Sequence, residues 1–477
     1  MQTFSYAIVG LGKLGASMAA AIASRGFEVI GVDVNQKSVD LVNAGRAPVH
    51  ETGLDELIRE NRSRLRATTD IREAICNSDL AFVIVPTPSE ANGAFSLRYA
   101  AAAFREIGRA LKHKSGYYTV VLTSTVLPGS TRSGLLPHLE AESGKIAGKD
   151  FGLCYSPEFI ALGSVIRDFL HPDFTLVGEF DQRSGDLLQH CYSQLLPDGP
   201  PCERMSLENA ELTKIAVNTY VTMKITYANM LANLCEEIPG GDVDAVTKAV
   251  GRDRRIGSKY LTGALGYGGP CFPRDNMALS FLARQLGTRA ELAETTDTLN
   301  RSLVPRTLAK LEKELRPGTT AAVLGLAYKP HSHVVEESQG MILAHALAET
   351  GIRVIAYDPL ARAMDVGTYA NPDMNGWLMH TSLQGCLDEA DIVLITTPDP
   401  MFKTLNSSNF ARVKPAVTVI DFWRILQQEL GGHQPHIRYV PVGHSCRDEH
   451  NQARLQKLWA PTTGVPDYEY SASAGAD

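Results

Sequence analysis

The feature that most restricts how this chain can fold is a glycine-rich turn close to its N-terminus. The turn, GLGKLG at residues 10–15, follows the apolar segment YAIV and precedes the alanine-rich segment ASMAAAIASRG. A second apolar segment, EVIGVD, then ends at Asp33. Short apolar runs of this kind indicate buried strands of a parallel sheet, with a helix between them. The order strand, turn, helix, strand and acid predicts the first βαβ unit of an α/β sheet.

The residues of this turn suit a dinucleotide. Gly10 permits the tight bend, Gly12 lets the backbone approach a pyrophosphate, and Gly15 lets the helix pack closely. The first N–H groups of the helix then face the phosphates, and we expect Leu14, within the turn, to contact the cofactor as well. Asp33 would accept a hydrogen bond from a ribose hydroxyl and repel a 2′-phosphate, which favours NAD over NADP. The alternative is a glycine turn that serves close packing alone.

Two further strands end in small or hydroxyl-bearing residues. SDLAFVIVPTP (78–88) contains Pro86 and Thr87 near its end, and YYTVVLTSTVLPGST (117–131) contains Ser124 and Thr125. Ligands of such sheets bind at the carboxyl ends of the strands, so we expect these four residues at the cofactor site. Strand-terminating turns without a ligand are the alternative.

A second, degenerate copy of this pattern occupies residues 320–424. TAAVLGLAYKP and RVIAYDP match the first two strands, and ADIVLITTPDP and AVTVIDFWR match the later two. It has no GxGxxG turn, so we expect it to hold the nucleotide part of a substrate and not a second dinucleotide. The predicted fold is therefore α/β, with two Rossmann-like doubly wound parallel-sheet domains joined by a long central helix.

The segment between the two copies predicts that helix. LLPDGPPCERMS (195–206) has the composition of a linker, Ser206 is a candidate N-cap, and 32 residues then follow without Gly or Pro. Apolar residues on more than one face suggest that the helix packs between domains and against a second subunit. The expected domains are 1–202 for NAD, 203–300 for dimerisation and the Cys271 loop, and 301–460 for the nucleotide sugar, with a disordered tail at 461–477.

Composition limits the partners and the compartment. The net charge of −7 argues against nucleic acid or an anionic membrane as the main partner. The N-terminus lacks the pattern of a secretory signal, and no run of apolar residues is long enough to span a membrane. Eight cysteines without CxxC spacing suit free thiols in a reducing compartment. We therefore expect a cytoplasmic protein.

One of these cysteines lies in the loop GYGGPCFPRD (266–275), whose glycines and prolines fix Cys271 in one place. A thiol needs a nearby cation or base to act as a nucleophile. Lys214, which shares a helical face with Asn218, is a candidate cation, and Asp275 is a candidate base or water ligand. The residue types permit this chemistry, but the sequence alone leaves open whether these groups meet or are ordinary exposed polar residues.

Taken together, the motifs resemble the UDP-glucose/GDP-mannose dehydrogenase family over about residues 1–430. The matching segments, in the family's order, are GLGKLG, Asp33, VPTP, STVLPGS, SPEF, KIAVN, RIG (255–257) and GYGGPCFPRD. The resemblance implies a four-electron oxidation of a nucleotide-sugar C6 alcohol to a uronic acid with two NAD⁺. UDP-glucose is the first expectation, and other UDP- or GDP-hexoses are alternatives.

Roles for individual residues also come from the resemblance. Cys271 would form a thiohemiacetal and then a thioester, Asp275 and Thr125 would handle the hydrolytic water, and Lys214 would stabilise the oxyanion. Arg255 would reach the substrate of a partner subunit in a homodimer or higher homo-oligomer. The remaining expected contacts are Glu158 and Asn218 with substrate or acid–base roles, Arg274 with the cofactor, and Tyr267, Gly268, Lys329 and Arg424 with the substrate.

The chain also departs from the family's pattern. Where KPNTDDxRxS is usual, His333 and Val334 replace two acids, and Glu336 replaces an arginine that commonly helps to bind NAD. Trp423 stands where the family often has a substrate-side arginine, next to Arg424. These departures keep open a catalytically silent nucleotide-sugar binder, and a two-electron β-hydroxyacid-type dehydrogenase is a further alternative. No metal site is expected, because His433, His436, His444, Cys446 and His450 have no recognised ligand spacing.

Overall fold

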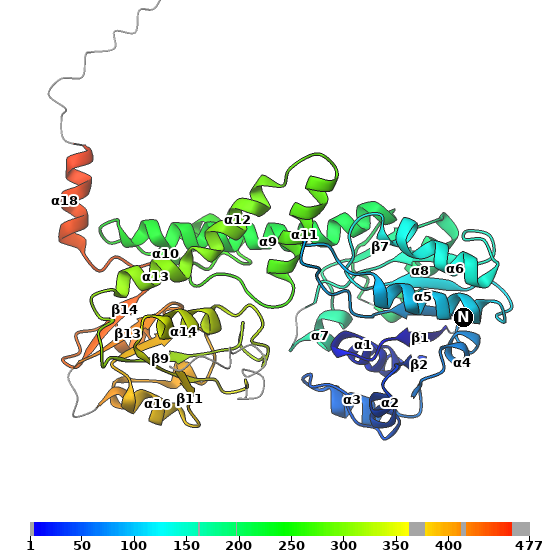
Figure 1. The fold of residues 1–477 in the computed structure, drawn as a ribbon, viewed down its shortest axis with the longest axis horizontal. Helices are drawn as coiled ribbons and strands as arrows, with labels where there is room; N and C mark the ends of the chain where they lie inside the picture. The colour runs from blue at the N-terminus through cyan, green and yellow to red at the C-terminus, as the bar shows by residue number, and fades with distance from the viewer. Residues whose placement is uncertain (1–3, 161–162, 197, 362–376, 412–415, 460–477) are drawn as a thin grey trace, which may run out of the picture.

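The computed structural model describes residues 4–160, 163–196, 198–361, 377–411 and 416–459. Two α/β units lie on either side of a helical middle (Figure 1). The long helix α9 (Leu207–Glu236) runs along that middle and connects them. The predicted fold class is confirmed: two sheets built mainly of parallel strands, joined by a long helix. The expected tail, 461–477, lies outside the described residues.

The N-terminal sheet has, within the described residues, eight strands in the order β3-β2-β1-β4-β5-β6-β7-β8. All neighbouring strands are parallel except β6 and β7. The strands are β1 Ser5–Val9, β2 Glu28–Val32, β3 Leu65–Thr68, β4 Leu80–Val83, β5 Thr119–Leu122, β6 Gly152–Tyr155, β7 Thr175–Glu179 and β8 Cys202–Ser206. The prediction of a plain linker at 195–206 was wrong in its last part, because Cys202–Ser206 pairs with β7 as the edge strand.

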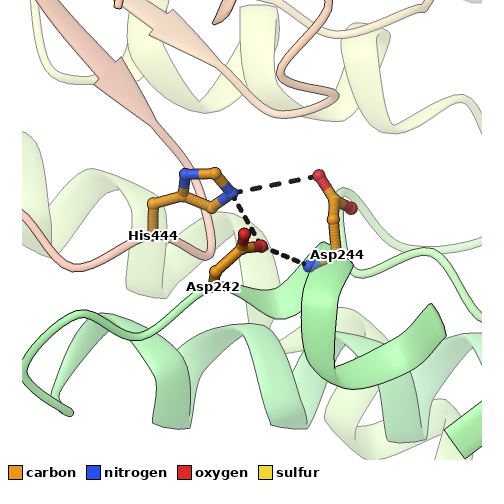
Figure 2. A group of neighbouring side chains, drawn as sticks. All are labelled: Asp242, Asp244 and His444. Carbon is orange, nitrogen blue, oxygen red and sulfur yellow. Dashed lines mark hydrogen bonds and ion pairs between the residues drawn. The ribbon is translucent and has the colours of Figure 1, made fainter. Parts of the chain in front are cut away.

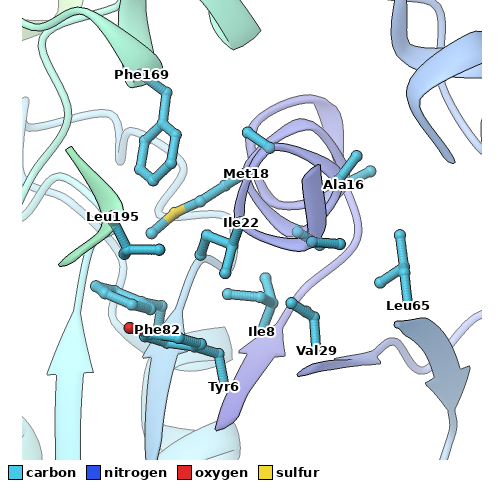
Figure 3. Packing of buried hydrophobic residues seen from close by; sticks show 14 of the residues in the cluster. Tyr6, Ile8, Ala16, Met18, Ile22, Val29, Leu65, Phe82, Phe169 and Leu195 are labelled. Carbon is cyan, nitrogen blue, oxygen red and sulfur yellow. The ribbon is translucent and has the colours of Figure 1, made fainter. Parts of the chain in front are cut away.

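Helices cover both faces of this sheet. One apolar layer lies under α1 and α8, and the other lies under α4, α5 and α6. Figure 3 shows Met18 and Ile22 of α1 packed over Ile8 and Phe82 of the sheet. The helices are α1 Lys13–Ser24, α2 Gln36–Asn43, α3 Leu54–Glu60, α4 Ile71–Cys76, α5 Arg98–Leu111, α6 Leu136–Ser143, α7 Val165–Leu170 and α8 Gln182–Leu195, with a π-helical turn at Ser130–Leu135.

The C-terminal sheet repeats the design of the first. Its order, in the part that the structure describes, is β11-β10-β9-β12-β13-β14, all parallel. The strands are β9 Thr320–Leu324, β10 Arg353–Tyr357, β11 Trp377–Met379, β12 Ile392–Ile395, β13 Val417–Asp421 and β14 Ile437–Pro441. The helices are α14 Gln339–Glu349, α16 Leu383–Glu389, α17 Gln427–Leu430 and α18 Asp448–Leu458, with 3₁₀ turns at Phe402–Thr404 and Ser407–Phe410.

The repeat extends to the hydrogen bonds at the first turn. Asp33 accepts from the Leu11 N–H at 2.8 Å, and Asp358 accepts from the Leu326 N–H at 2.7 Å in the matching place. Together with the repeated strand order, this carboxylate-to-backbone hydrogen bond confirms the predicted second, degenerate copy.

The helical middle consists of α9, α10 (Val243–Gly251), α11 (Phe272–Gln285), α12 (Glu291–Arg301) and α13 (Leu303–Leu311). Ser206 caps α9 as predicted, its hydroxyl accepting from the Asn209 N–H at 3.3 Å. Among the described residues, no helix combines the length and apolar character that a membrane crossing requires.

Candidate active site

The glycine turn has the shape that a bound pyrophosphate requires. Gly10 has a left-handed φ of 103°, and a Cβ at Gly15 would lie 1.8 Å from the Gly10 carbonyl oxygen. Gly12, by contrast, has no heavy atom within 4 Å of its Cβ position. Two glycines therefore serve the turn and its packing, whereas Gly12 faces open space at the start of α1. Asp33, which accepts from the Leu11 N–H, closes the turn.

The loops after β4 and β5 are tied to each other and to α11. The Ser124 hydroxyl donates to the Val85 carbonyl at 2.7 Å, and the Thr87 hydroxyl donates to the Thr125 carbonyl at 2.7 Å. The Arg274 guanidinium donates to the Thr87 carbonyl at 3.2 Å. The predicted cofactor loops, including Pro86, and the start of the Cys271 helix thus form one continuous surface.

Cys271 immediately precedes α11 and is exposed. The next turn of the helix brings Asp275 under it, with the Asp275 N–H donating to the Cys271 carbonyl at 2.9 Å. Asp275 is only 1% exposed, and Asn218 of α9 donates to its carboxylate at 2.6 Å. Arg274 lies 3.4 Å from the other carboxylate oxygen. Cys271, Arg274 and Asp275, which are close in the sequence, therefore meet Asn218, which lies 57 positions before Asp275, at one end of α11.

Lys214 supplies a buried cation to this group. Its ammonium donates to the Glu158 carbonyl at 2.6 Å and lies 4.8 Å from the centre of the Phe159 ring. Burial lowers the pKa of Lys214, and the charges of Asp275 and Cys271 oppose that change.

The same surroundings act on the thiol. Although Cys271 keeps an exposed surface, desolvation raises the pKa of its thiol, and Asp275 raises it further. The cations Arg274 and Lys214 partly offset both effects. The thiol is therefore protonated at neutral pH, and a base must take its proton when it adds to a carbonyl.

Glu158 presents its backbone carbonyl to Lys214. Lys214 contacts its backbone carbonyl, whereas the Glu158 side chain lines a cavity of about 10 Å³ with Ser156 and Tyr192. Burial raises the pKa of Glu158 to about 7, and Lys214 opposes the rise. A carboxyl group with such a pKa can hold or release a proton near neutral pH.

The C-terminal unit contributes Lys329 and Glu336. Lys329 is half-buried, burial lowers the pKa of its ammonium, and Asp168 and Glu51 of the N-terminal unit oppose that change. Glu336 accepts from the Gly269 N–H through its carbonyl at 3.1 Å, and its charge adds to the forces that raise the pKa of Cys271. The unusual segment 329–338 therefore lies against the thiol loop.

His333, another unusual residue of that segment, meets the N-terminal unit. Its ring packs edge-on against His50, with the ring centres 5.7 Å apart. Val334 is in the same segment, where the Tyr328 N–H donates to its carbonyl at 3.0 Å.

Two expected substrate residues lie apart from this group. The Arg255 side chain is 87% exposed and pairs with Asp253 through its guanidinium at 2.6 Å. Arg424 is buried, and its guanidinium forms a bidentate pair with Asp244 of α10 at 2.7 and 2.8 Å. Trp423, its neighbour, donates its indole N–H to the Thr396 carbonyl at 2.8 Å. Arg424 thus fastens the C-terminal sheet to the helical middle.

One cluster of possible metal ligands adjoins Arg424. Figure 2 shows His444 facing Asp242 and Asp244, whose ligand atoms lie within 4.8 Å of one another. Asp244 is paired with Arg424, and Asp242 caps α10 by accepting the N–H groups of Asp244 and Ala245. Capping and ion pairing therefore account for both carboxylates, and sequence reasoning missed them because His444 lies some 200 positions away.

Sequence reasoning also missed two amide side chains that touch the thiol loop. Asn300 of α12 and Gln339 of α14 both contact the peptide groups of Tyr267. Each lies outside the glycine-rich motif, in a helix with no recognised motif of its own, so no local pattern marks them.

Family models cover most of the chain. Residues 5–196 match the NAD binding domain of the UDP-glucose/GDP-mannose dehydrogenase family, 208–302 its central domain and 322–428 its UDP binding domain. Among curated proteins, GDP-mannose 6-dehydrogenase of Pseudomonas putida is 36% identical over 83% of this chain and 92% of its own. UDP-glucose 6-dehydrogenase AglM of Haloferax volcanii is 35% identical over 89% and 97%.

Solved structures of UDP-glucose and GDP-mannose dehydrogenases are also similar to this chain. A UDP-glucose dehydrogenase from the archaeon Pyrobaculum islandicum superposes with a TM-score of 0.82 at 31% identity, covering 93% of this chain and 98% of that one. A ternary complex of GDP-mannose dehydrogenase from Pseudomonas aeruginosa gives a TM-score of 0.51 at 30% identity, covering 91% and 99%.

Proposed function

Because the chain belongs to the UDP-glucose/GDP-mannose dehydrogenase family and is therefore an NAD-dependent nucleotide-sugar 6-dehydrogenase, we propose that it oxidises UDP-glucose to UDP-glucuronate in two steps on Cys271. The observation that carries the proposal is the convergence of four groups at one end of α11. Cys271 and Asp275 come from that helix, and Lys214 and Asn218 come from α9.

The turn at Gly10–Gly15 and Asp33 fit NAD, since Gly12 leaves room for a pyrophosphate beside the free N–H groups of α1. NAD⁺ held there would supply the hydride acceptor for both oxidations, and two molecules would be needed per sugar. Arg274, Thr87 and Ser124 then hold the cofactor loops against the thiol helix.

The residues around the thiol have separate roles in the two oxidations and the hydrolysis. The first oxidation removes a hydride from C6 and releases the hydroxyl proton to solvent, which gives an aldehyde. The Cys271 sulfur then adds to C6 while the thiol proton also passes to solvent, which gives the anion of a thiohemiacetal. Lys214 stabilises the oxygen anion that forms. Loss of the second hydride leaves a thioester. Water held by Asp275 and Thr125 adds to it, and release of the carboxylate returns the thiol.

Glu158 and Asn218 support this chemistry. Glu158, with a pKa of about 7, serves as a proton holder behind Lys214. Asn218 orients the Asp275 carboxylate through its 2.6 Å hydrogen bond. Lys329 reaches the substrate from the C-terminal unit, and Tyr267 and Gly268 shape the loop beside it.

UDP-glucose is proposed as substrate because the C-terminal residues match a UDP binding domain and because the Pyrobaculum islandicum enzyme superposes at a TM-score of 0.82. GDP-mannose is the second candidate, which the 36% identity to the Pseudomonas putida enzyme favours. Cytoplasmic location stays a prediction.

We also propose a homodimer through α9. Tyr220, Tyr227 and Leu234 recur every seven residues, so they share one face of the helix, and each is about half exposed. An apolar stripe of this kind is typical of an interface. In such a dimer the exposed Arg255 would reach the partner's substrate.

The test counts NADH. With UDP-glucose and NAD⁺ the protein should form two NADH per sugar and UDP-glucuronate, and the Cys271→Ser variant should form no more than trace acid while still binding NAD. Cys446→Ser, at the other exposed cysteine, is the matched control. One NADH per sugar with free aldehyde would identify a two-electron enzyme, and binding without turnover on UDP- and GDP-sugars would identify a silent binder. Full acid production by Cys271→Ser would refute the thioester route.

A further inference from the structure

The loop that carries Cys271 is held by an amide side chain, which hydrogen-bonds to its backbone in the way that a neighbouring β-strand would. Asn300, only 5% exposed, accepts from the Tyr267 N–H at 2.9 Å and donates to the Tyr267 carbonyl at 3.0 Å. One side chain thus satisfies both peptide groups of a residue four positions before the thiol. Because backbone groups buried without partners are costly, this pairing restricts the loop to one path.

Two glycines of the loop lie close to neighbouring atoms. A Cβ at Gly266 would lie 2.2 Å from the Asn300 side-chain oxygen, so the backbone there is as close as glycine permits. On the other side, a Cβ at Gly268 would lie 2.2 Å from the Glu337 carbonyl oxygen. The loop is therefore packed between α12 and the segment that leads into α14.

A second amide comes from the C-terminal unit. Gln339, at the first turn of α14, donates to the same Tyr267 carbonyl at 3.1 Å. The Tyr267 hydroxyl, in turn, accepts from Asn276 of α11 at 2.9 Å, and Asn276 contacts Thr222 of α9. Tyr267 therefore joins α9, α11, α12 and α14 at one point.

We propose that Asn300 is a positioning residue for the Cys271 thiol, with Gln339 as its partner from the nucleotide-sugar unit. The inference rests on the proposed function, in which Cys271 is the nucleophile. Asn300 does not reach the reacting atoms. It sets the path of residues 266–270, and the end of that path decides where the sulfur lies relative to C6. An error of about 1 Å at a reacting atom costs on the order of 100-fold in rate.

Two variants separate positioning from folding. Asn300→Ala removes both hydrogen bonds, and the isosteric Asn300→Asp keeps the acceptor for the Tyr267 N–H while placing an oxygen against the Tyr267 carbonyl. The matched control is Thr298→Ala on the same helix, whose exposed hydroxyl donates to the Glu294 carbonyl one turn earlier. Gln339→Ala removes only the hydrogen bond from Gln339 to the Tyr267 carbonyl and keeps those of Asn300.

The measurements are steady-state kinetics, the yield of acid per NADH, trapping of released aldehyde with a carbonyl reagent, and the rate of Cys271 alkylation by iodoacetamide. Alkylation is compared in a background that carries Cys446→Ser, since Cys446 is the other exposed thiol. For both Asn300 variants we expect acid formation to slow by about 10- to 100-fold, with KM for NAD⁺ changed less than about threefold. Aldehyde should escape, and the alkylation rate should change by at least about fivefold. Gln339→Ala should show a smaller change of the same kind, and Thr298→Ala none.

The outcomes are separable. If both Asn300 variants match the wild type in acid yield and alkylation, the positioning role is wrong. If they lose thermal stability while the folded fraction keeps wild-type alkylation and kcat, Asn300 is merely structural and the proposal is again wrong. Failure of the wild type to form two NADH per sugar would refute the proposed function instead, and the alkylation comparison would still decide whether Asn300 places the thiol.

Discussion

Replacing Arg424 by alanine should unfold the C-terminal unit more easily without removing a substrate contact. The guanidinium donates twice to Asp244, and one of its nitrogens is shared among the carbonyls of Gly263, Phe422 and Val442 at 2.7 to 2.9 Å. That nitrogen carries two hydrogens, so the three carbonyl contacts amount to about two full hydrogen bonds, or roughly 2 kcal/mol. Because the Asp244 side chain is 51% exposed, its two bonds are discounted to about 1 kcal/mol each. The expected loss is about 4 kcal/mol.

A glycine variant refines the estimate. Arg424 has a left-handed φ of 56°. Alanine at this position would have the same steric strain, whereas glycine would not. Arg424→Gly should therefore lose about 1 kcal/mol less than Arg424→Ala. Arg438→Ala is the control, because its ion pair with Glu314 is more than half exposed on the arginine side and should contribute less than about 1 kcal/mol.

The assay is urea unfolding followed by tryptophan fluorescence. Trp377, Trp423 and Trp459 are the three tryptophans of the chain, and all belong to its C-terminal part, so the signal reports that unit. With a slope of about 2 kcal/mol per molar urea, the alanine variant should shift the midpoint by about 2 M. A midpoint within about 0.3 M of wild type, combined with a large rise in KM for the nucleotide sugar, would refute the reasoning and make Arg424 a substrate ligand.

Three further predictions follow from the geometry. Gly12→Ala should fold normally and raise KM for NAD⁺, because its Cβ would enter the open space at the turn. Gly15→Ala should lower the melting temperature, because its Cβ would lie 1.8 Å from the Gly10 carbonyl oxygen. Equal melting temperatures for the two variants would contradict this prediction. Desolvation and Asp275 raise the pKa of Cys271, so its alkylation rate should still be rising above about pH 8.5, where an ordinary thiol is half ionised. Lys214→Ala should move the midpoint of the alkylation pH profile higher. A midpoint at or below that of a free thiol would refute the assignment. Arg255→Ala should cut turnover at least about tenfold without changing stability, since its exposed ion pair contributes less than about 1 kcal/mol. Mixing this variant with Cys271→Ser should restore part of the activity, because a mixed dimer keeps one intact site. No recovery would argue against a site shared between subunits.

Local patterns were enough for most of the fold. The apolar runs near Tyr6, Val29, Ala81 and Val120 all became central strands, because strands buried on both faces must be apolar throughout. The strand Cys202–Ser206 was taken for a linker because an edge strand is only half covered and carries no apolar run.

The site was less predictable because its contacts are long-range. Motif spacing identified Cys271, Lys214, Asn218 and Asp275, which the structure brings together. The sequence could not show that Lys214 meets the carbonyl of Glu158 and not its carboxylate, since both belong to the same residue.

The sequence could not reveal the contacts of Arg424 and Asn300 for the same reason. The partner of Arg424 lies 180 positions earlier, and Asn300 pairs with a residue 33 positions away. No local pattern encodes such distances. A left-handed residue that follows a strand also turns its side chain in a direction that residue type alone does not reveal.

The contact between α14 and the thiol loop has a consequence for protein engineering. Gln339 and the backbone of Glu336 and Glu337 touch the loop directly, so the C-terminal half is not an exchangeable module. A chimera that takes residues 301–459 from a relative with another nucleotide preference would import a foreign surface against Tyr267. Transplanting that preference therefore requires moving the loop, α12 and the segment before α14 together.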